Sequence, residues 1–311
     1  MSALPVHIGY LSNPDKVFYN ILDKVLIKAL ENNGAKVQLF DLNDISFHLQ
    51  KNKITLFNKS TPVYNLKGFL SFGYMAKFHY EAYKYIAQTL NTMNIQTLYT
   101  PKVEEILANK YLQAIAFSKG NVPIPNTGIS FTIEGFKTLS KLKFPQTSVL
   151  KELSDYGGDG VSIHPNKESL VNAAAKYLWK NEYSLYQKYI DDSYGKSIRV
   201  LCINNKPIAC SEYVNKANSF KSNSSFGYKY FSLLSLMNHP KRKTYERIAQ
   251  KAVNAIGKGI TIAGVDILDS KKHGEVVLEV NPWPDLFDIR ETTKIDVFDL
   301  LAKEFIRKIK H

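Results

Sequence analysis

The chain has 311 residues, 44% of them hydrophobic and 22% charged, which is ordinary composition for a globular protein with two or three compact lobes. No apolar run approaches the roughly 20 residues that a membrane span needs, and the N-terminus lacks the charged and apolar blocks of a signal peptide. The net charge of +13 (41 Lys+Arg against 28 Asp+Glu) favours anionic partners. Because the basic residues are spread along the chain, however, the charge alone names no partner.

The two cysteines, Cys202 and Cys210, stand at either end of a predicted hairpin. Two cysteines in a chain of this length indicate buried thiols in a reducing compartment rather than a disulfide framework. We therefore expect a cytoplasmic protein.

The first hundred residues predict a small open α/β lobe. A strand at 6–11, a helix over 18–29 that ends at Asn33-Gly34, and a strand at 36–40 form a βαβ unit, which predicts a parallel sheet. A hairpin or irregular excursion at 52–64, a strand at 68–73, a helix over 80–90 and a strand at 95–99 follow. No Gly-x-Gly-x-x-Gly fingerprint follows the first strand, which argues against a dinucleotide-dependent dehydrogenase.

The rest of the chain predicts α+β lobes with antiparallel pairing. The expected helices cover 102–119, 133–142, 168–179, 240–256 and 297–309. The expected strands cover 127–131, 147–152, 161–163, 184–190, 264–268 and 276–282, with more strands after 191. The predicted division is an N-terminal α/β lobe at 1–100, a central lobe with a glycine-rich lid at 101–190, and a C-terminal lobe at 191–311 that carries the metal ligands.

Polar side chains interrupt the two apolar strands near the C-terminus. Strand alternation places Val277, Glu279 and Asn281 on one face, and Asp266 stands among hydrophobic residues on the preceding strand. If these strands pair through the polar turn between them, three oxygen ligands converge, a set that suits Mg²⁺ shared with substrate phosphates. The alternative is a solvent-facing strand with ordinary polar residues, and the pattern leaves both open.

Two cations are embedded in other apolar strands. Lys151 precedes a turn with three glycines in four positions, where backbone N–H groups and an ammonium could hold phosphates, although no Walker loop is present. A flexible hairpin tip with a solvated lysine is the alternative. Arg199 could pair with a carboxylate or stabilise negative charge on a reacting group. The seven histidines show no metal-ligand spacing, and no Ser-His-Asp or Cys-His arrangement supports a nucleophilic hydrolase.

Taken in order, these segments resemble the ATP-grasp superfamily, and most closely its RimK-type amino-acid ligases. The resemblance is carried by Asn109-Lys110, Val149-Leu150-Lys151 with its glycine loop, Tyr186–Ile190, Ser197-Ile198-Arg199, Gly264-Val265-Asp266, Leu278–Pro282 and Ile289–Asp296. It runs from about residue 100 to the end. It implies an ATP-grasp fold, preceded by an N-terminal Rossmann-like lobe.

The resemblance also implies a reaction, cofactors and a site. ATP and two Mg²⁺ (or Mn²⁺) ions would be bound, a carboxylate would attack the γ-phosphate to give an acyl phosphate, and an amine would capture it as an amide. The catalytic residues implied are Arg199 and Lys221. The nucleotide-binding residues implied are Lys110, Lys151, Gly157, Gly158, Gln187, Lys188, Tyr189 and Asn223. The metal ligands implied are Asp266, Glu279 and Asn281.

Some positions depart from the RimK pattern. Lys188 and Ser197 stand where the family usually has acidic residues, and Lys221 replaces an arginine, which removes bidentate geometry. The segments 224–230 and 282–287 also differ, so the usual glutamate-adding specificity is not carried over. Their aromatic residues, Tyr228, Trp283 and Phe287, suggest a reshaped pocket or, equally, local packing.

The sequence thus predicts an ATP-dependent carboxylate–amine ligase that adds an amino acid to a peptide, a protein or a small metabolite. A second hypothesis within the same class is an enzyme that makes a small dipeptide-like metabolite or modifies a ribosomally made peptide. The expected partners are ATP, a carboxylate and an amine acceptor, one of them acidic. We expect no membrane partner, the resemblance disfavours nucleic acid, and a homo-oligomer stays open. The alternative function is a nucleotide- or nucleic-acid-binding protein that has lost catalysis, which the changes at Lys188 and Ser197 motivate.

Overall fold

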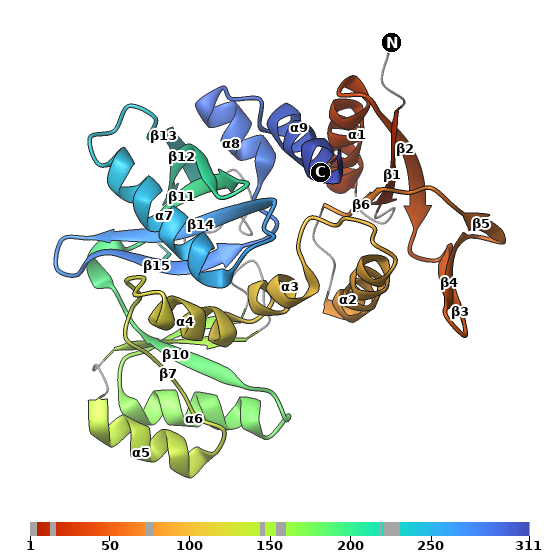
Figure 1. Cartoon of the computed structure of the whole chain (residues 1–311). Coiled ribbons are helices and arrows are strands. Elements are labelled where there is room, and N and C mark those ends of the chain that lie inside the picture. Colours follow the sequence, from red (N-terminus) through yellow and green to blue (C-terminus); the bar gives the residue numbers. More distant parts are fainter. Residues whose placement is uncertain are drawn as a thin grey trace. The chain divides into compact units, whose positions relative to one another are not determined.

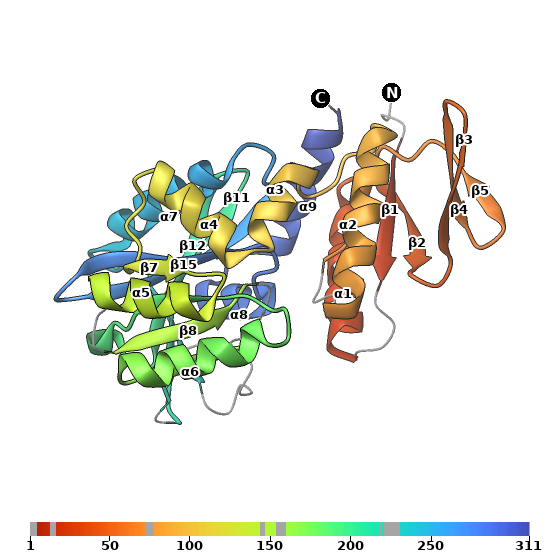
Figure 2. The same cartoon turned by 90° about the horizontal axis from the view of Figure 1, so that it is seen from below.

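A computed structural model of the chain describes residues 5–12, 17–72, 77–143, 147–153, 160–217, 219–220 and 231–310. The chain forms two compact units, and each contains segments that are far apart in the sequence (Figures 1 and 2). Unit 1 consists of Met1–Glu104, Lys258–Ile262 and Asp285–His311, and unit 2 of Glu105–Gly257 and Ala263–Pro284. None of the described helices is both long enough and apolar enough to cross a membrane.

Unit 1 contains the predicted parallel sheet. Its strands are β1 (Val6–Ser12), β2 (Ala35–Asp41) and β6 (Gly68–Leu70), in the order β2-β1-β6, with both pairs parallel. The helices α1 (Val17–Asn32) and α2 (Lys77–Thr92) belong to the same lobe. The βαβ prediction is confirmed. The strand expected at 95–99 is not continuous, because Gln96 and Tyr99 make only isolated bridges, to Gly68 and Ile260.

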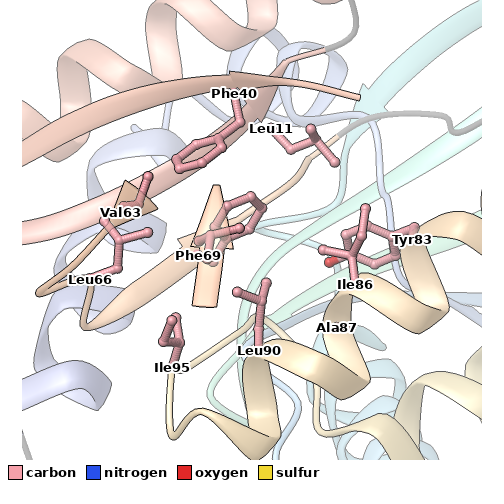
Figure 3. Packing of buried hydrophobic residues seen from close by; sticks show 11 residues of the cluster. Leu11, Phe40, Val63, Leu66, Phe69, Tyr83, Ile86, Ala87, Leu90 and Ile95 are labelled. Carbon is pink, nitrogen blue, oxygen red and sulfur yellow. The ribbon is translucent and has the colours of Figure 1, made fainter. Parts of the chain in front are cut away.

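A second, antiparallel sheet of unit 1 extends from the end of β2. It consists of β3 (Ile45–Gln50), β4 (Lys53–Asn58) and β5 (Thr61–Val63). The expected hairpin is therefore present but begins earlier, at Ile45. The buried side chains of this sheet join those of the parallel sheet and α2 in one hydrophobic cluster, whose ring pair Phe40–Phe69 has centroids 5.1 Å apart (Figure 3).

Two C-terminal helices complete unit 1, namely α8 (Leu286–Thr293) and α9 (Val297–Lys310). The apolar stripe of α9 is buried, and α9 packs against α1. Helix α9 was predicted from the sequence, whereas α8 was not.

In unit 2, the helices α5 (Ile133–Lys143) and α6 (Lys167–Leu178) cover one face of a four-stranded antiparallel sheet (Figure 1). The sheet order is β7 (Thr127–Ile129), β10 (Ser184–Lys188), β8 (Ser148–Glu152), β9 (Val161–His164). Leu150 and Tyr186 pack against Phe136, Leu170 and Ala174 of these helices. Leu150 and Tyr186 therefore mark the helix-covered face, and their neighbours along each strand point to the opposite face.

The helix expected at 102–119 is two helices, α3 (Pro101–Leu107) and α4 (Lys110–Lys119). Asn109 separates them, because its side chain accepts hydrogen bonds from the N–H groups of Tyr111 and Leu112 and so caps α4.

The second sheet of unit 2 has five strands. Its order is β13 (Phe231–Ser235), β12 (Lys206–Asn215), β11 (Lys196–Ile203), β14 (Ile262–Ser270), β15 (Gly274–Asn281). Helix α7 (Arg242–Ile256) packs on it, and a 3-10 turn, η1 (Asp191–Ser193), precedes β11. Cys202 and Cys210 lie in the β11–β12 hairpin as free, buried thiols, as predicted, and burial raises the pKa of each to about 12.

The two compact units cut the chain differently from the predicted boundaries at 100 and 190. Both sheets of unit 2 lie in one compact unit, and the last 27 residues belong with the N-terminal segment. The division into three lobes stays a prediction.

Candidate active site

Asp266 and Glu279 lie directly opposite each other on the paired strands β14 and β15, and Gly264 lies opposite Asn281. A β-bulge separates Asp266 from Ile267, so that Ile267 pairs with Val277. The expected alternation from Val277 to Asn281 is therefore interrupted, because the bulge adds a residue on β15. Glu279 and Asn281 both come after this interruption and share a face with Asp266.

The amide of Asn281 has a defined orientation, because its Oδ1 accepts a hydrogen bond of 2.8 Å from the N–H of Trp283. Within the described residues, no group of three or more His, Cys, Asp or Glu side chains could hold a metal ion. The oxygen donors that fit a hard divalent cation are instead two carboxylates and one amide.

Arg199 on β11 forms a bidentate ion pair with the carboxylate of Asp266. Its Nε and Nη2 atoms lie 2.7 and 2.8 Å from Oδ1 and Oδ2, and each side chain is 12% exposed. Burial lowers the pKa of the guanidinium, but the Asp266 carboxylate outweighs it, so that the pKa lies well above its usual value. Burial likewise raises the pKa of Asp266, which Arg199 opposes. Arg199 thus pairs with a carboxylate, which was one of the two roles that the sequence allowed. Because this ion pair uses only one edge of the guanidinium, the other edge can still stabilise negative charge on a reacting group.

Lys151 on β8 belongs to the sheet face away from α5 and α6, because it neighbours the helix-facing Leu150. Burial lowers the pKa of its ammonium from 10.5 to about 8, while Glu279 and Asp266 raise it and Lys110 lowers it. Lys151 therefore feels both carboxylates and a second lysine. The backbone N–H of Lys110 donates to the carbonyl of Leu153 at 2.9 Å, which ties the start of α4 to the end of β8.

Gln187 on β10 shares the face of Lys151, since Leu185 pairs with Lys151 and Gln187 lies two residues further along β10. Its Nε2 lies 3.1 Å from the Thr127 hydroxyl, which itself donates to the carbonyl of Pro125 at 2.7 Å. Because that hydroxyl proton is already used, Thr127 can only accept from Gln187, which fixes the amide orientation. The buried Oε1 atom is left without a hydrogen-bond partner in the described part of the chain.

Lys188 lies on the same face as Tyr186, the face covered by α5 and α6, because the two residues are separated by one position. The N–H groups of Lys188 and Tyr189 donate to the carbonyls of Asn126 and Thr147, at 2.8 and 3.2 Å. The protein itself therefore uses the N–H groups of both residues, and the implied binding of a nucleotide by Lys188 and Tyr189 stays a prediction.

Gln113 on α4 is a site residue that sequence reasoning missed. Its side chain accepts from the N–H of Val280 at 2.8 Å and donates to the carbonyls of Val280 and Leu107, at 3.2 and 2.8 Å. Val280 lies between Glu279 and Asn281, so Gln113 fixes the backbone that presents both candidate ligands. A buried glutamine three residues after Lys110 carries no sequence signal of this contact.

Tyr213 on β12 was also missed, and its buried ring lies under the Arg199 guanidinium, 5.0 Å from the ring centroid. Ser197, where the family usually has an acid, is buried directly opposite Tyr213.

Phe287 packs against the ring of Phe298, with the ring centroids 5.1 Å apart. This contact supports local packing, rather than a reshaped pocket, as the role of Phe287. Four of the predicted site residues lie outside the described part of the chain, namely Gly157, Gly158, Lys221 and Asn223. Tyr228 also lies outside it.

The family model of the RimK-like ATP-grasp domain matches residues 107–309, which is more than half of the chain. The chain belongs to the RimK-like ATP-grasp family. This confirms the family and the ATP-grasp fold that the sequence predicted.

Individual relatives of this RimK-like chain carry ligase names. A probable alpha-L-glutamate ligase of Pectobacterium carotovorum is 30% identical over 198 residues, which are 63% of this chain and 61% of the relative. A probable alpha-L-glutamate ligase of Mannheimia succiniciproducens is 27% identical over 288 residues, or 90% of this chain and 92% of the relative. The match thus spans less than two thirds of the first relative and nearly all of the second.

Among solved structures, the ATP-grasp ligase PsnB, in complex with a variant precursor, Mg and ADP, superposes with a TM-score of 0.69. It is 12% identical, and the match covers 99% of this chain and 100% of PsnB. At this identity the likeness shows the ATP-grasp fold alone.

Proposed function

We propose that this RimK-like chain is an ATP-dependent carboxylate–amine ligase that forms an amide bond through an acyl phosphate. The observation that carries the proposal is the gathering of Asp266, Glu279, Arg199 and Lys151 within unit 2. Two carboxylates beside two partly buried cations match the charges of a metal-bound polyphosphate, whereas a protein that only binds nucleic acid has no use for the carboxylates.

The proposed reaction has two displacements. A substrate carboxylate oxygen attacks the γ-phosphorus, the bond to the β-phosphate oxygen breaks, and ADP leaves. The amine nitrogen then attacks the acyl carbon, loses a proton, and phosphate leaves. Lys151 neutralises phosphate charge, and the unused N–H groups of Arg199 stabilise the charge that develops on the transferred phosphoryl group.

The donor set fits divalent cations, and Asp266, Glu279 and Asn281 would hold two of them. When bound, Mg²⁺ neutralises phosphate charge and orients the reacting oxygens. Gln113 and the Trp283 N–H keep Glu279 and Asn281 in place for this task.

Gln187 supplies a buried hydrogen-bond acceptor for the nucleotide base. An adenine amino group would satisfy its Oε1 atom, whereas guanine presents an oxygen in the corresponding place. We expect Gln187→Leu to weaken ATP binding about 5- to 10-fold without loss of thermal stability, since it removes a buried, unsatisfied carbonyl. Isothermal titration with ATP and GTP checks this, with Thr127→Ser as the control that keeps the hydroxyl. Unchanged ATP affinity in Gln187→Leu would exclude this contact.

The relatives' names offer glutamate as an added amino acid, but the segments 224–230 and 282–287 differ from the family pattern. The amine and the acid are therefore best found by experiment. The test is ADP release from Mg²⁺-ATP with each proteinogenic amino acid, alone and combined with an acidic peptide or a small-molecule cell extract. We expect ADP only with a particular acid–amine pair, together with an amide product of matching mass.

The matched control is Glu279→Gln, which removes a charge and nearly preserves size. It should abolish ADP release while the circular dichroism spectrum stays unchanged, and full amide synthesis in Glu279→Gln would exclude the proposed metal site. Tight ATP binding without substrate-dependent ADP release in the unmodified protein would favour the binding-protein alternative.

A further inference from the structure

We propose that Tyr213 is a positioning residue, whose ring face holds the Arg199 guanidinium in the orientation that the ligase reaction needs. This inference rests on the proposed function for its chemical consequence. Its structural part, a ring that fixes a guanidinium, stands by itself.

Strand register brings the two side chains together. Ser197 pairs with Tyr213 and Arg199 pairs with Ser211, so Arg199 and Tyr213 are diagonal neighbours on one face of adjacent strands. A diagonal pair lies within reach of an aromatic ring and a long side chain. The Arg199 Cζ atom lies over the ring, 5.0 Å from its centroid, which is within the distance of a cation–π interaction.

Two contacts then hold the Arg199 guanidinium. Asp266 accepts hydrogen bonds from its Nε and Nη2 atoms along one edge, and its Cζ atom lies over the ring of Tyr213. The arginine stem also passes beside Gly264, where a Cβ atom would lie at an ordinary contact distance of 3.4 Å from Cδ of Arg199 but only 2.8 Å from Pro284. The Nη1 atom and one N–H of Nη2 are not used by these contacts.

The carboxylate of Asp266 and the ring of Tyr213 restrain different motions of the Arg199 guanidinium. The carboxylate fixes rotation within the guanidinium plane, and the ring fixes the tilt of that plane. An arginine that is held by its carboxylate alone can still tilt about the shared edge, which would move Nη1 away from a reacting phosphate. Orientation of this kind matters because small displacements of a charge-stabilising donor lower turnover strongly.

Tyr213 is well anchored for this role. It is 2% exposed and lies on an interior strand, between Ser197 on β11 and Leu233 on β13. A leucine in its place fills much of the volume but offers no negative ring face. A phenylalanine keeps that face and removes only the hydroxyl.

The experiment uses the full chain without ligand. The protein has five arginines, Arg199, Arg242, Arg247, Arg290 and Arg307, so the side-chain Nε–Hε spectrum is simple and Arg199→Lys assigns the signal. We expect the ¹⁵N heteronuclear NOE of Arg199 to be high in the wild type and in Tyr213→Phe, and to fall in Tyr213→Leu. An unchanged NOE in Tyr213→Leu overturns the inference.

Turnover supplies the second readout, with the acid–amine pair that ADP release identifies. Tyr213→Phe should keep kcat within about twofold, and Tyr213→Leu should lower kcat about 10- to 30-fold while KM for ATP changes less than threefold. In the Arg199→Lys background, Tyr213→Leu should cause no further loss, because an ammonium has no plane to orient. Equal losses in the Phe and Leu variants, or additive losses with Arg199→Lys, overturn the inference.

The variant Tyr245→Leu is the control for the general loss of stability that follows when a buried tyrosine is replaced. Tyr245 is a buried tyrosine of α7, the helix beside Cys210 on the opposite face of the same sheet. The Tyr245→Leu variant should lower Tm as Tyr213→Leu does, but it should leave the Arg199 NOE and kcat unchanged. If no acid–amine pair releases ADP, the proposed function fails while the NOE still decides whether Tyr213 holds Arg199.

Discussion

Lys151 and Lys188 stand on neighbouring strands but on opposite faces of one sheet. Lys151 should contact ATP phosphates, and Lys188, on the helix-covered face, should not. We expect Lys151→Met to weaken ATP binding about 10- to 100-fold, the range for a lost hydrogen bond to a charged group. Lys188→Met, the matched control, should change ATP affinity less than about twofold. Isothermal titration measures both, and equal effects would contradict the face assignment.

Glu104 on α3 predicts a pH dependence of stability. Burial raises the pKa of its carboxyl from 4.5 to about 8, and the nearby Lys84 opposes this. A raised pKa means that the folded state binds a proton that the unfolded state has lost, so stability falls as pH rises from about 4.5 to 8. We expect Glu104→Gln to remove this decline, which is on the order of a few kcal/mol at most.

Urea unfolding at pH 5, 6, 7 and 8 measures the effect. Glu105→Gln is the control, because Glu105 is the next residue of the same helix and is exposed. Parallel pH profiles for the wild type and Glu104→Gln would show that Glu104 does not carry the dependence.

At the level of elements, Gln113 links α4 to β15. It satisfies both backbone groups of Val280, the residue between Glu279 and Asn281. In Gln113→Leu these buried groups lose their partner, which should lower the free energy of unfolding by about 2–3 kcal/mol. We also expect faster hydrogen exchange at the Val280 amide. Gln250→Leu, at an exposed α7 position with one side-chain bond to Asn205, should cost under about 1 kcal/mol.

Element types followed from the sequence more reliably than element continuity. The βαβ unit and the hairpin of β14 and β15 were predicted because apolar runs and turn residues are local signals. The break at Asn109, the bulge after Asp266 and the loss of the strand at 95–99 were not. Each depends on a partner distant in sequence or on a cap that competes with the helical pattern.

At the scale of the whole molecule, unit 1 combines the N-terminal segment of the chain with its C-terminal segment. Gly68 on β6 lies under α9, where a Cβ atom would be 3.1 Å from the ring of Phe305 and far closer to Ile309. We expect Gly68→Ala to destabilise unit 1 by about 1–3 kcal/mol through overpacking. Adding Ile309→Ala should recover part of that loss, since the closest contact is with the end of a flexible side chain. Thermal unfolding of the single and double variants measures this, and additive losses would contradict it.

The sequence by itself identified the family, through a resemblance carried by several motifs in order, and named the charged residues of the candidate site, because Lys151, Arg199, Asp266 and Glu279 interrupt otherwise apolar strands. Such interruptions are local and readable. Only the tertiary structure decided that Arg199 grips Asp266, that Tyr213 lies beneath it, that Gln113 holds Val280 and that Gln187 leaves an acceptor unsatisfied. Strand register and hydrogen-bond direction set these contacts, and both arise from pairings between segments that are remote in the chain.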